Sequence, residues 1–113
     1  MHELSITQSM LEVALEQAGK SEAKEIKKIN VVVGEMTGIV EQCVQFYFKF
    51  LGKGTIAEGA ILSFSRVPTT ARCRSCGKDF KVEEFAWACP YCGVNDLEIT
   101  AGKELFVESI EVE

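Results

Sequence analysis

The hydrophobic pattern at the start of the chain changes period once, and each period predicts a different element. From residue 3 to 18, apolar side chains recur at helical spacing, and Gly19 follows where a helix would end; the stripe comprises Leu4, Leu11, Ala14, Leu15 and Ala18. Between residues 26 and 33, Ile29, Val31 and Val33 alternate with other residues. This alternation predicts a β-strand that ends at Gly34.

A turn over residues 34–38 separates this strand from a second predicted helix at 40–51. One face of that helix would carry Val40, Val44, Tyr47, Phe48 and Leu51. Because Phe46 and Phe50 widen this face, we expect the helix to be covered over much of its circumference. Cys43 lies in the middle of the same helix, where we expect a small buried hydrophobe; a reactive thiol is the alternative.

Two further strands are predicted, at residues 60–67 and 104–112. Leu62 and Phe64 would point inward from the first, and the second would carry Phe106, Ile110 and Val112 on one face. Two helices packed on a three-stranded sheet form an α+β domain with two layers. If the second and third strands pair as an antiparallel hairpin, residues 68–103 form its loop, and a structureless loop of that length would be improbable.

Four cysteines in residues 68–103 provide a metal site that would give this long loop a structure of its own. Cys73 and Cys76 precede Gly77, Cys89 and Cys92 precede Gly93, and the whole forms a C-x2-C-x12-C-x2-C pattern. Each pair aims two thiolates at one ion, and four thiolates complete a tetrahedral shell. We therefore predict a four-cysteine zinc-ribbon module at 69–101, inserted between the last two strands of an α/β domain made of residues 1–68 and 102–113.

The identity of this metal rests on the surroundings of the cysteines. A closed four-thiolate shell fits structural zinc, with no open position for catalysis. The same ligands would hold iron in a rubredoxin-like electron-transfer site, but redox iron favours an apolar surround, and this loop carries Lys78, Asp79 and Lys81. Zinc is the prediction, and iron remains the alternative.

Composition and charge narrow the classes of function. The chain has 113 residues, 47% of them hydrophobic, and a net charge of −5. Residues 71–100 hold four basic and five acidic side chains, which argues against nucleic-acid binding through a concentrated basic face. A zinc-ribbon module that binds a protein partner or one specific nucleic-acid site remains the second hypothesis.

The sequence also bears on location and catalysis. No segment is apolar enough to span a bilayer, and the first residues lack the pattern of a secretory signal, so we expect a cytoplasmic protein with reduced cysteines. No Ser/His/Asp set, glycine-rich phosphate loop or open zinc site is visible, so we expect no catalytic residues and no enzymatic activity.

His2 is the only histidine. An exposed histidine at a frayed terminus is the ordinary interpretation. The alternative is a chelate in which the Met1 amine, the His2 amide nitrogen and His2 Nδ1 bind one ion through fused five- and six-membered rings. Such a planar nitrogen set suits Ni(II) or Cu(II), and Glu3, water or another acidic group would supply the fourth ligand.

The order of these motifs resembles the HypA/HybF family of hydrogenase nickel-incorporation proteins, some of which also serve urease. The resemblance rests on the Met1-His2-Glu3 start, the strand that ends in Val33-Gly34-Glu35, the segment Ala57-Glu58-Gly59-Ala60 and both cysteine pairs. It covers essentially the whole chain.

The resemblance implies a nickel metallochaperone without turnover. It implies nickel as cargo at Met1 and His2, with Glu3 tuning the site or recruiting partners, and structural zinc at Cys73, Cys76, Cys89 and Cys92. The implied partners are a nickel-handling GTPase and the large subunit of [NiFe]-hydrogenase, with a weak homodimer left open and no nucleic-acid or membrane partner. Some relatives offer nickel a further histidine, which this chain lacks.

Overall fold

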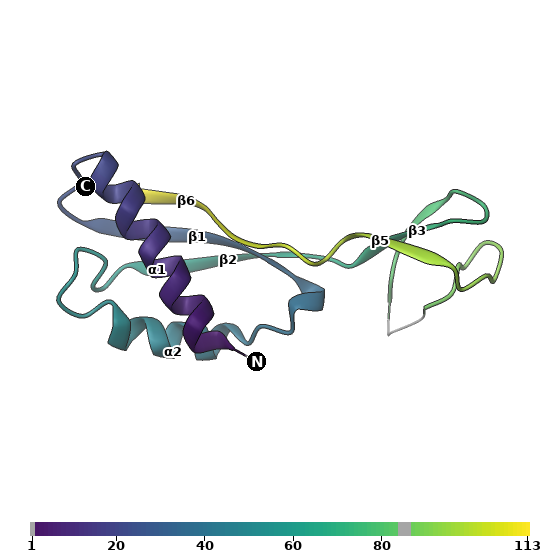
Figure 1. Ribbon diagram of the computed structural model, residues 1–113, viewed down its shortest axis with the longest axis horizontal. Helices are drawn as coiled ribbons and strands as arrows, with labels where there is room; N and C mark the ends of the chain where they lie inside the picture. The colour runs from purple at the N-terminus through teal and green to yellow at the C-terminus, as the bar shows by residue number, and fades with distance from the viewer. Residues whose placement is uncertain (1, 84–86) are drawn as a thin grey trace.

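A computed structural model describes residues 2–83 and 87–113 as two helices and two three-stranded sheets (Figure 1). The elements in chain order are α1 (Glu3–Lys20), β1 (Ile26–Gly34), the short 3-10 helix η1 (Glu35–Thr37), α2 (Glu41–Leu51), β2 (Ile61–Val67), β3 (Thr70–Cys73), β4 (Asp79–Lys81), β5 (Leu97–Ala101) and β6 (Leu105–Val112). The first sheet has the order β2-β1-β6 and the second the order β4-β3-β5. This confirms the predicted α+β class, with the cysteine segment between the last two strands of the helix-covered sheet.

Strand β1 lies at the centre of the first sheet and supplies much of the core. Its Ile29, Val31 and Val33 are buried, and Val31 pairs with Phe64 of β2 on one side and Val107 of β6 on the other. The second and third predicted strands, β2 and β6, do not pair as the hairpin considered above, because they occupy opposite edges of the sheet. The α2 crossover returns β2 parallel to β1, as parallel pairing requires a long connection.

The prediction that Phe106 shares one face of β6 with Ile110 and Val112 is wrong, because a β-bulge lies between Phe106 and Ile110. Asn30 pairs with Ser109 and Val31 with Val107, so Glu108 is the extra residue. An extra residue shifts the in–out alternation by one position. Consequently Leu105, Val107 and Ile110 pack on the core, whereas Phe106 is 49% exposed.

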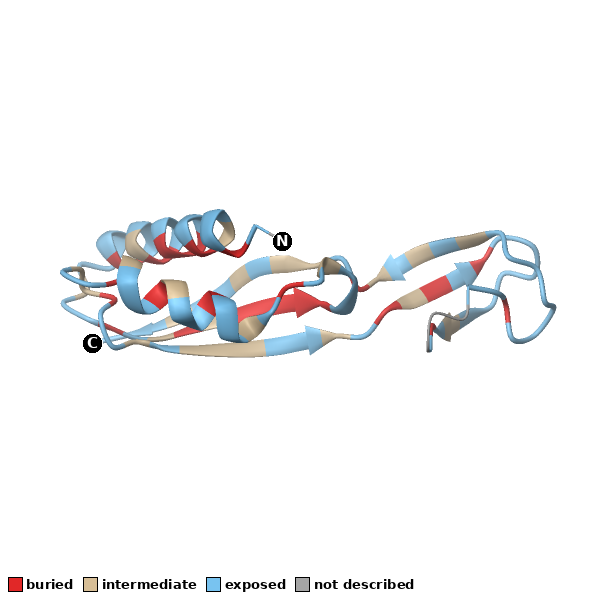
Figure 2. Ribbon diagram, turned by 90° about the horizontal axis from the view of Figure 1, so that it is seen from below, coloured by how far each residue is buried: buried red, intermediate tan, exposed pale blue. Residues whose placement is uncertain are grey.

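Both helices cover one face of this sheet (Figure 2), through Met10, Leu11, Ala14 and Ala18 of α1 and Val44 and Phe48 of α2. The expectation that α2 is covered over most of its circumference is wrong. Phe46 and Phe50 are 57% and 58% exposed, and Val40 is exposed too. Phe46 and Phe50 each follow a buried residue by two positions, about 200° around a helix with 3.6 residues per turn, so they face away from the sheet.

A close backbone contact joins the two sheets, which lie along one 55 Å axis. The Met36 N–H donates to the Gly102 carbonyl over 2.8 Å, and the Gly34 N–H donates to the Glu104 carbonyl over 2.6 Å. A Cβ at Gly34 would lie 2.1 Å from the Gly102 oxygen, so only glycine fits there. Gly102 itself has a φ of +117°, a conformation that glycine adopts readily. These contacts fix where the second sheet begins.

Candidate metal sites

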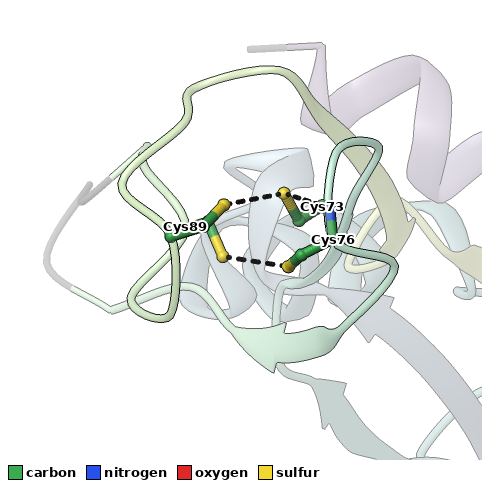
Figure 3. Close-up of side chains that lie close together, drawn as sticks. Cys73, Cys76 and Cys89 are labelled. Carbon is green, nitrogen blue, oxygen red and sulfur yellow. Dashed lines mark hydrogen bonds between the residues drawn. The ribbon is translucent and has the colours of Figure 1, made fainter.

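Two loops with the same local structure bring the four cysteines together beside the second sheet. Figure 3 shows Cys73 and Cys76 of the first loop facing Cys89 of the second. In the first, the Gly77 N–H donates to the Cys73 carbonyl; in the second, the Gly93 N–H donates to the Cys89 carbonyl, each over 2.8 Å. Gly77 and Gly93 have φ values of +76° and +77°. Glycine tolerates this conformation without steric cost, which explains its position directly after each pair.

The spacing of the sulfur atoms fits one tetrahedral metal ion. All four Sγ atoms lie within 4.8 Å of one another. The Sγ atoms of Cys73 and Cys92 are 3.5 Å apart, and those of Cys76 and Cys89 are 3.7 Å apart. Four sulfurs at about 2.3 Å from a central ion would be separated by roughly 3.8 Å. The four side chains therefore fit a metal of the size of zinc with little movement.

Backbone donors favour the thiolate form of one cysteine in each loop. The Cys76 N–H donates to Cys73 Sγ over 3.4 Å, and this bond lowers the pKa of the Cys73 thiol. Burial raises the pKa of the Cys89 thiol. Hydrogen bonds from the N–H groups of Cys92 and Tyr91, together with the Cys92 and Cys76 side chains, outweigh burial and bring this pKa down to about 7. Thiolates are the form that binds a metal, so these donors prepare the ligands.

In the other two cysteines, the nearby sulfurs raise the pKa of the thiol. The Val94 N–H lowers the pKa of Cys92, but burial and the three neighbouring cysteine sulfurs, Cys73 first among them, together outweigh it, and the pKa rises to about 12. The pKa of Cys76 is also raised, because burial and the Cys73 and Cys89 sulfurs outweigh the Lys78 N–H. Neighbouring sulfurs resist a second negative charge unless a cation neutralises both. The arrangement is thus suited to binding a cation.

The N-terminal residues lie far from this cluster, beside the helices (Figure 1). Met1 lies outside the described residues. The His2 side chain is exposed, and the His2 carbonyl accepts the first α1 hydrogen bond, from the Ile6 N–H. Among the residues that the structure describes, His2 joins no group of metal-ligating side chains. The structure thus brings together the four predicted cysteine ligands and does not bring His2 to them.

Glu3, in contrast, is only 8% exposed. Its Oε2 accepts a hydrogen bond from the Val40 N–H over 3.3 Å, immediately before α2. The first N–H groups of a helix lack intrahelical partners and carry a partial positive charge, so a carboxylate there is stabilising. Glu3 therefore fastens the start of α1 to the start of α2.

No local sequence pattern reveals the contact between Glu3 and Val40. Glu3 and Val40 are 37 positions apart, and an acidic residue in a first helical turn is ordinarily explained by its own helix. Cys43 also departs from expectation, because the structure exposes it. It lies on the outer side of α2 and is not a buried hydrophobe. No described helix is both long and apolar enough to cross a membrane.

Comparisons with known proteins identify relatives over the whole chain. The family model described as "Hydrogenase/urease nickel incorporation, metallochaperone, hypA" matches residues 1–112. A hydrogenase maturation factor HypA from Dehalococcoides mccartyi is 45% identical over 113 residues, which cover 100% of this chain and 95% of that protein. The factor of the same name from Caldanaerobacter subterraneus subsp. tengcongensis is 45% identical over 114 residues, with 100% of both covered.

Solved structures of HypA proteins have the same fold as this chain. The solution structure of the Ni metallochaperone HypA from Helicobacter pylori superposes with a TM-score of 0.69 at 25% identity, covering 99% of this chain and 97% of that one. A second solution structure of a HypA protein gives a TM-score of 0.76 at 25% identity, covering 100% and 97%. The arrangement of helices and sheets described above is thus shared with experimentally determined relatives.

Proposed function

Because the chain belongs to the HypA family of nickel-incorporation metallochaperones, we propose that it binds Ni(II) at its N-terminus and delivers the ion during maturation of [NiFe]-hydrogenase. The family description also names urease, which we include as a second recipient. Nickel is cargo in this proposal, so the chain performs no catalytic turnover. The proposed partners are a nickel-handling GTPase and the hydrogenase large subunit, which receives the metal in the cytoplasm.

The proposed nickel ligands are three nitrogens from Met1 and His2. The Met1 amine, the His2 amide nitrogen and His2 Nδ1 would form adjacent chelate rings, which suit a planar Ni(II) ion. Glu3 belongs to the proposed site because it directly follows His2 and holds the helix start against α2. The fourth ligand would be Glu3, water or a group of the receiving protein.

The position of His2 is the observation that most supports this proposal. Its imidazole is exposed, whereas the next residue is buried and hydrogen-bonded to α2. A carrier needs ligands that an acceptor protein can reach and remove one at a time. The backbone next to these ligands must also be held in place, so that the acceptor protein meets the ion at a reproducible position. An exposed imidazole next to an anchored carboxylate satisfies both needs.

We propose zinc as the resident ion of Cys73, Cys76, Cys89 and Cys92, in a domain of residues 69–101 attached to the nickel-binding domain of residues 1–68 and 102–113. Four thiolates on zinc form a closed, redox-inactive cross-link between the two cysteine loops. Cys76, Cys92 and Tyr91 are exposed. Such an open surface is unfavourable for redox iron, which supports zinc over the rubredoxin-like alternative.

Equilibrium nickel titration of the untagged, zinc-loaded chain tests the proposal. We expect close to one nickel per wild-type chain, loss of that binding in His2→Ala, and unchanged zinc content in both. Glu12→Ala, which removes an exposed carboxylate of the same helix, is the control and should bind nickel normally. Retention of full nickel affinity by His2→Ala would show that nickel binds elsewhere.

A further inference from the structure

The outer face of α2 carries an uncovered aromatic stripe, formed by Cys43, Phe46, Tyr47 and Phe50. Cys43, Phe46 and Phe50 are exposed, and Tyr47 is half-buried. The buried side of the helix, with Val44 and Phe48, already packs on the sheet. The stripe therefore contributes nothing to the core of the chain, yet it concentrates large apolar groups in two turns of helix.

The stripe is ordered by contacts among its own members. The Phe46 and Phe50 rings meet edge to face with centroids 5.1 Å apart, and Phe46 makes a similar contact with Tyr47 at 5.6 Å. The Lys53 ammonium lies 5.3 Å from the Phe50 centroid. Aromatic side chains held in place lose little conformational entropy on binding and are frequent anchors of protein interfaces. The rings are thus arranged as a preformed contact surface.

The stripe begins close to the proposed nickel site. Cys43 follows Val40 by three residues, or about 4.5 Å along a helix axis, and the Val40 N–H is the group that binds the Glu3 carboxylate. This hydrogen bond holds the start of α1 beside the start of α2. A protein docked on the stripe would therefore lie next to the first residues of the chain.

The charges beside the stripe define the occupant. Lys49 and Lys53 border it, and neither forms an ion pair with any residue that the structure describes. The chain as a whole has a net charge of −5, so this local positive charge is not a general property of its surface. Complementary potentials favour a partner that presents carboxylates at the same positions.

Two other occupants fit less well. In a symmetric contact with a second copy, the same surface would face itself, so Lys49 and Lys53 would lie near the same lysines of the other copy, and like charges there oppose association. A membrane surface would require a larger basic cluster than two lysines.

We propose that the α2 stripe is the docking surface for a protein partner with an apolar groove bordered by Asp and Glu side chains. Resting on the proposed function, we identify this partner as the nickel-handling GTPase. The aromatic rings insert into the groove, and Lys49 and Lys53 meet its acidic border. Docking in this position holds the partner beside His2 while nickel is transferred.

Binding of the purified nickel-handling GTPase from the same organism, measured by isothermal titration calorimetry with the zinc-loaded chain, tests this proposal. Phe46→Ser/Phe50→Ser should weaken binding at least tenfold. Phe106→Ser, which changes an exposed phenylalanine on β6, is the matched control and should leave it unchanged. Lys49→Glu should weaken binding more at low than at high salt, whereas Lys103→Glu should not.

A second measurement does not depend on any substitution. Cys43 is the only cysteine outside the cluster, so the rate of its alkylation in the zinc-loaded wild type should fall when the GTPase is added. Unchanged alkylation, or equal loss of binding in Phe106→Ser, would refute docking on this face. So would a wild-type chain that dimerises through the stripe, or that binds vesicles of phosphatidylserine instead of the GTPase.

These outcomes are separable from those of the proposed nickel site. The stripe variants keep Met1, His2 and Glu3, so their nickel stoichiometry should equal that of the wild type. Failure of the wild type to bind nickel would disprove the proposed function whatever the docking result. Normal nickel binding with no effect of the stripe variants on GTPase affinity would disprove only the docking surface.

Discussion

Replacing Glu3 by alanine should destabilise the helical part of the molecule, because Glu3 joins the two helices. Its carboxylate is buried and accepts the Val40 N–H at the start of α2. A hydrogen bond that involves a charged group contributes about 1.5–3 kcal/mol. We therefore expect a loss of about 2 kcal/mol in the free energy of unfolding.

Chemical denaturation of the zinc-loaded chain measures this loss directly. Thermal unfolding should show a midpoint lower by roughly 8–16 °C for a cooperative unit of 60–100 residues. Glu3→Gln retains an acceptor oxygen and should lose roughly half as much free energy. Glu12→Ala removes an exposed carboxylate from the same helix and should stay within about 0.5 kcal/mol of the wild type. If Glu3→Ala were as stable as Glu12→Ala, the Glu3–Val40 contact would have no structural importance.

Three further predictions concern the junction, the zinc and the nickel. Gly34→Ala should destabilise the chain by more than 2 kcal/mol in denaturant titrations, because its Cβ would overlap the Gly102 carbonyl; Gly19→Ala, with open space around its Cβ, should be neutral or stabilising. Removal of zinc by a chelator should collapse the dispersed NMR signals of residues 69–101 into the narrow range of an unfolded chain, because zinc binding supplies about 10–16 kcal/mol to the folding of such modules. The signals of the first sheet should stay in place, and simultaneous loss of both sheets would contradict this prediction. Nickel affinity should fall as the pH is lowered, because protons compete for the amine, amide and imidazole nitrogens; an affinity independent of pH in a titration series would argue against nitrogen ligands.

The parts of the fold that depend on neighbouring residues were predictable from the sequence. The two cysteine loops follow from short spacing and from the glycine after each pair, and β1 follows from alternation over Ile29, Val31 and Val33. The helices were visible because their apolar residues recur at a fixed period.

The errors all concern relations between distant residues or between the two sides of one element. The hairpin considered for the second and third strands does not form, because β2 and β6 each pair with the central strand β1 and not with one another. The Glu108 bulge changed which side of β6 is buried, and no local pattern announces it. Counting the apolar residues of α2 did not reveal that Cys43, Phe46 and Phe50 face away from the sheet. The site contact between Glu3 and Val40 was hidden for the same reason.

Blocking the terminal amine tests the central claim that nickel is held by backbone and side-chain nitrogens of Met1 and His2. N-terminal acetylation of the zinc-loaded chain removes the amine as a ligand while every side chain stays in place. A one-residue extension is unsuitable, because histidine at the third position creates a strong chelate of its own. The account predicts that the acetylated chain loses its one-nickel binding in an equilibrium titration and keeps its zinc; unchanged nickel affinity after acetylation would contradict it.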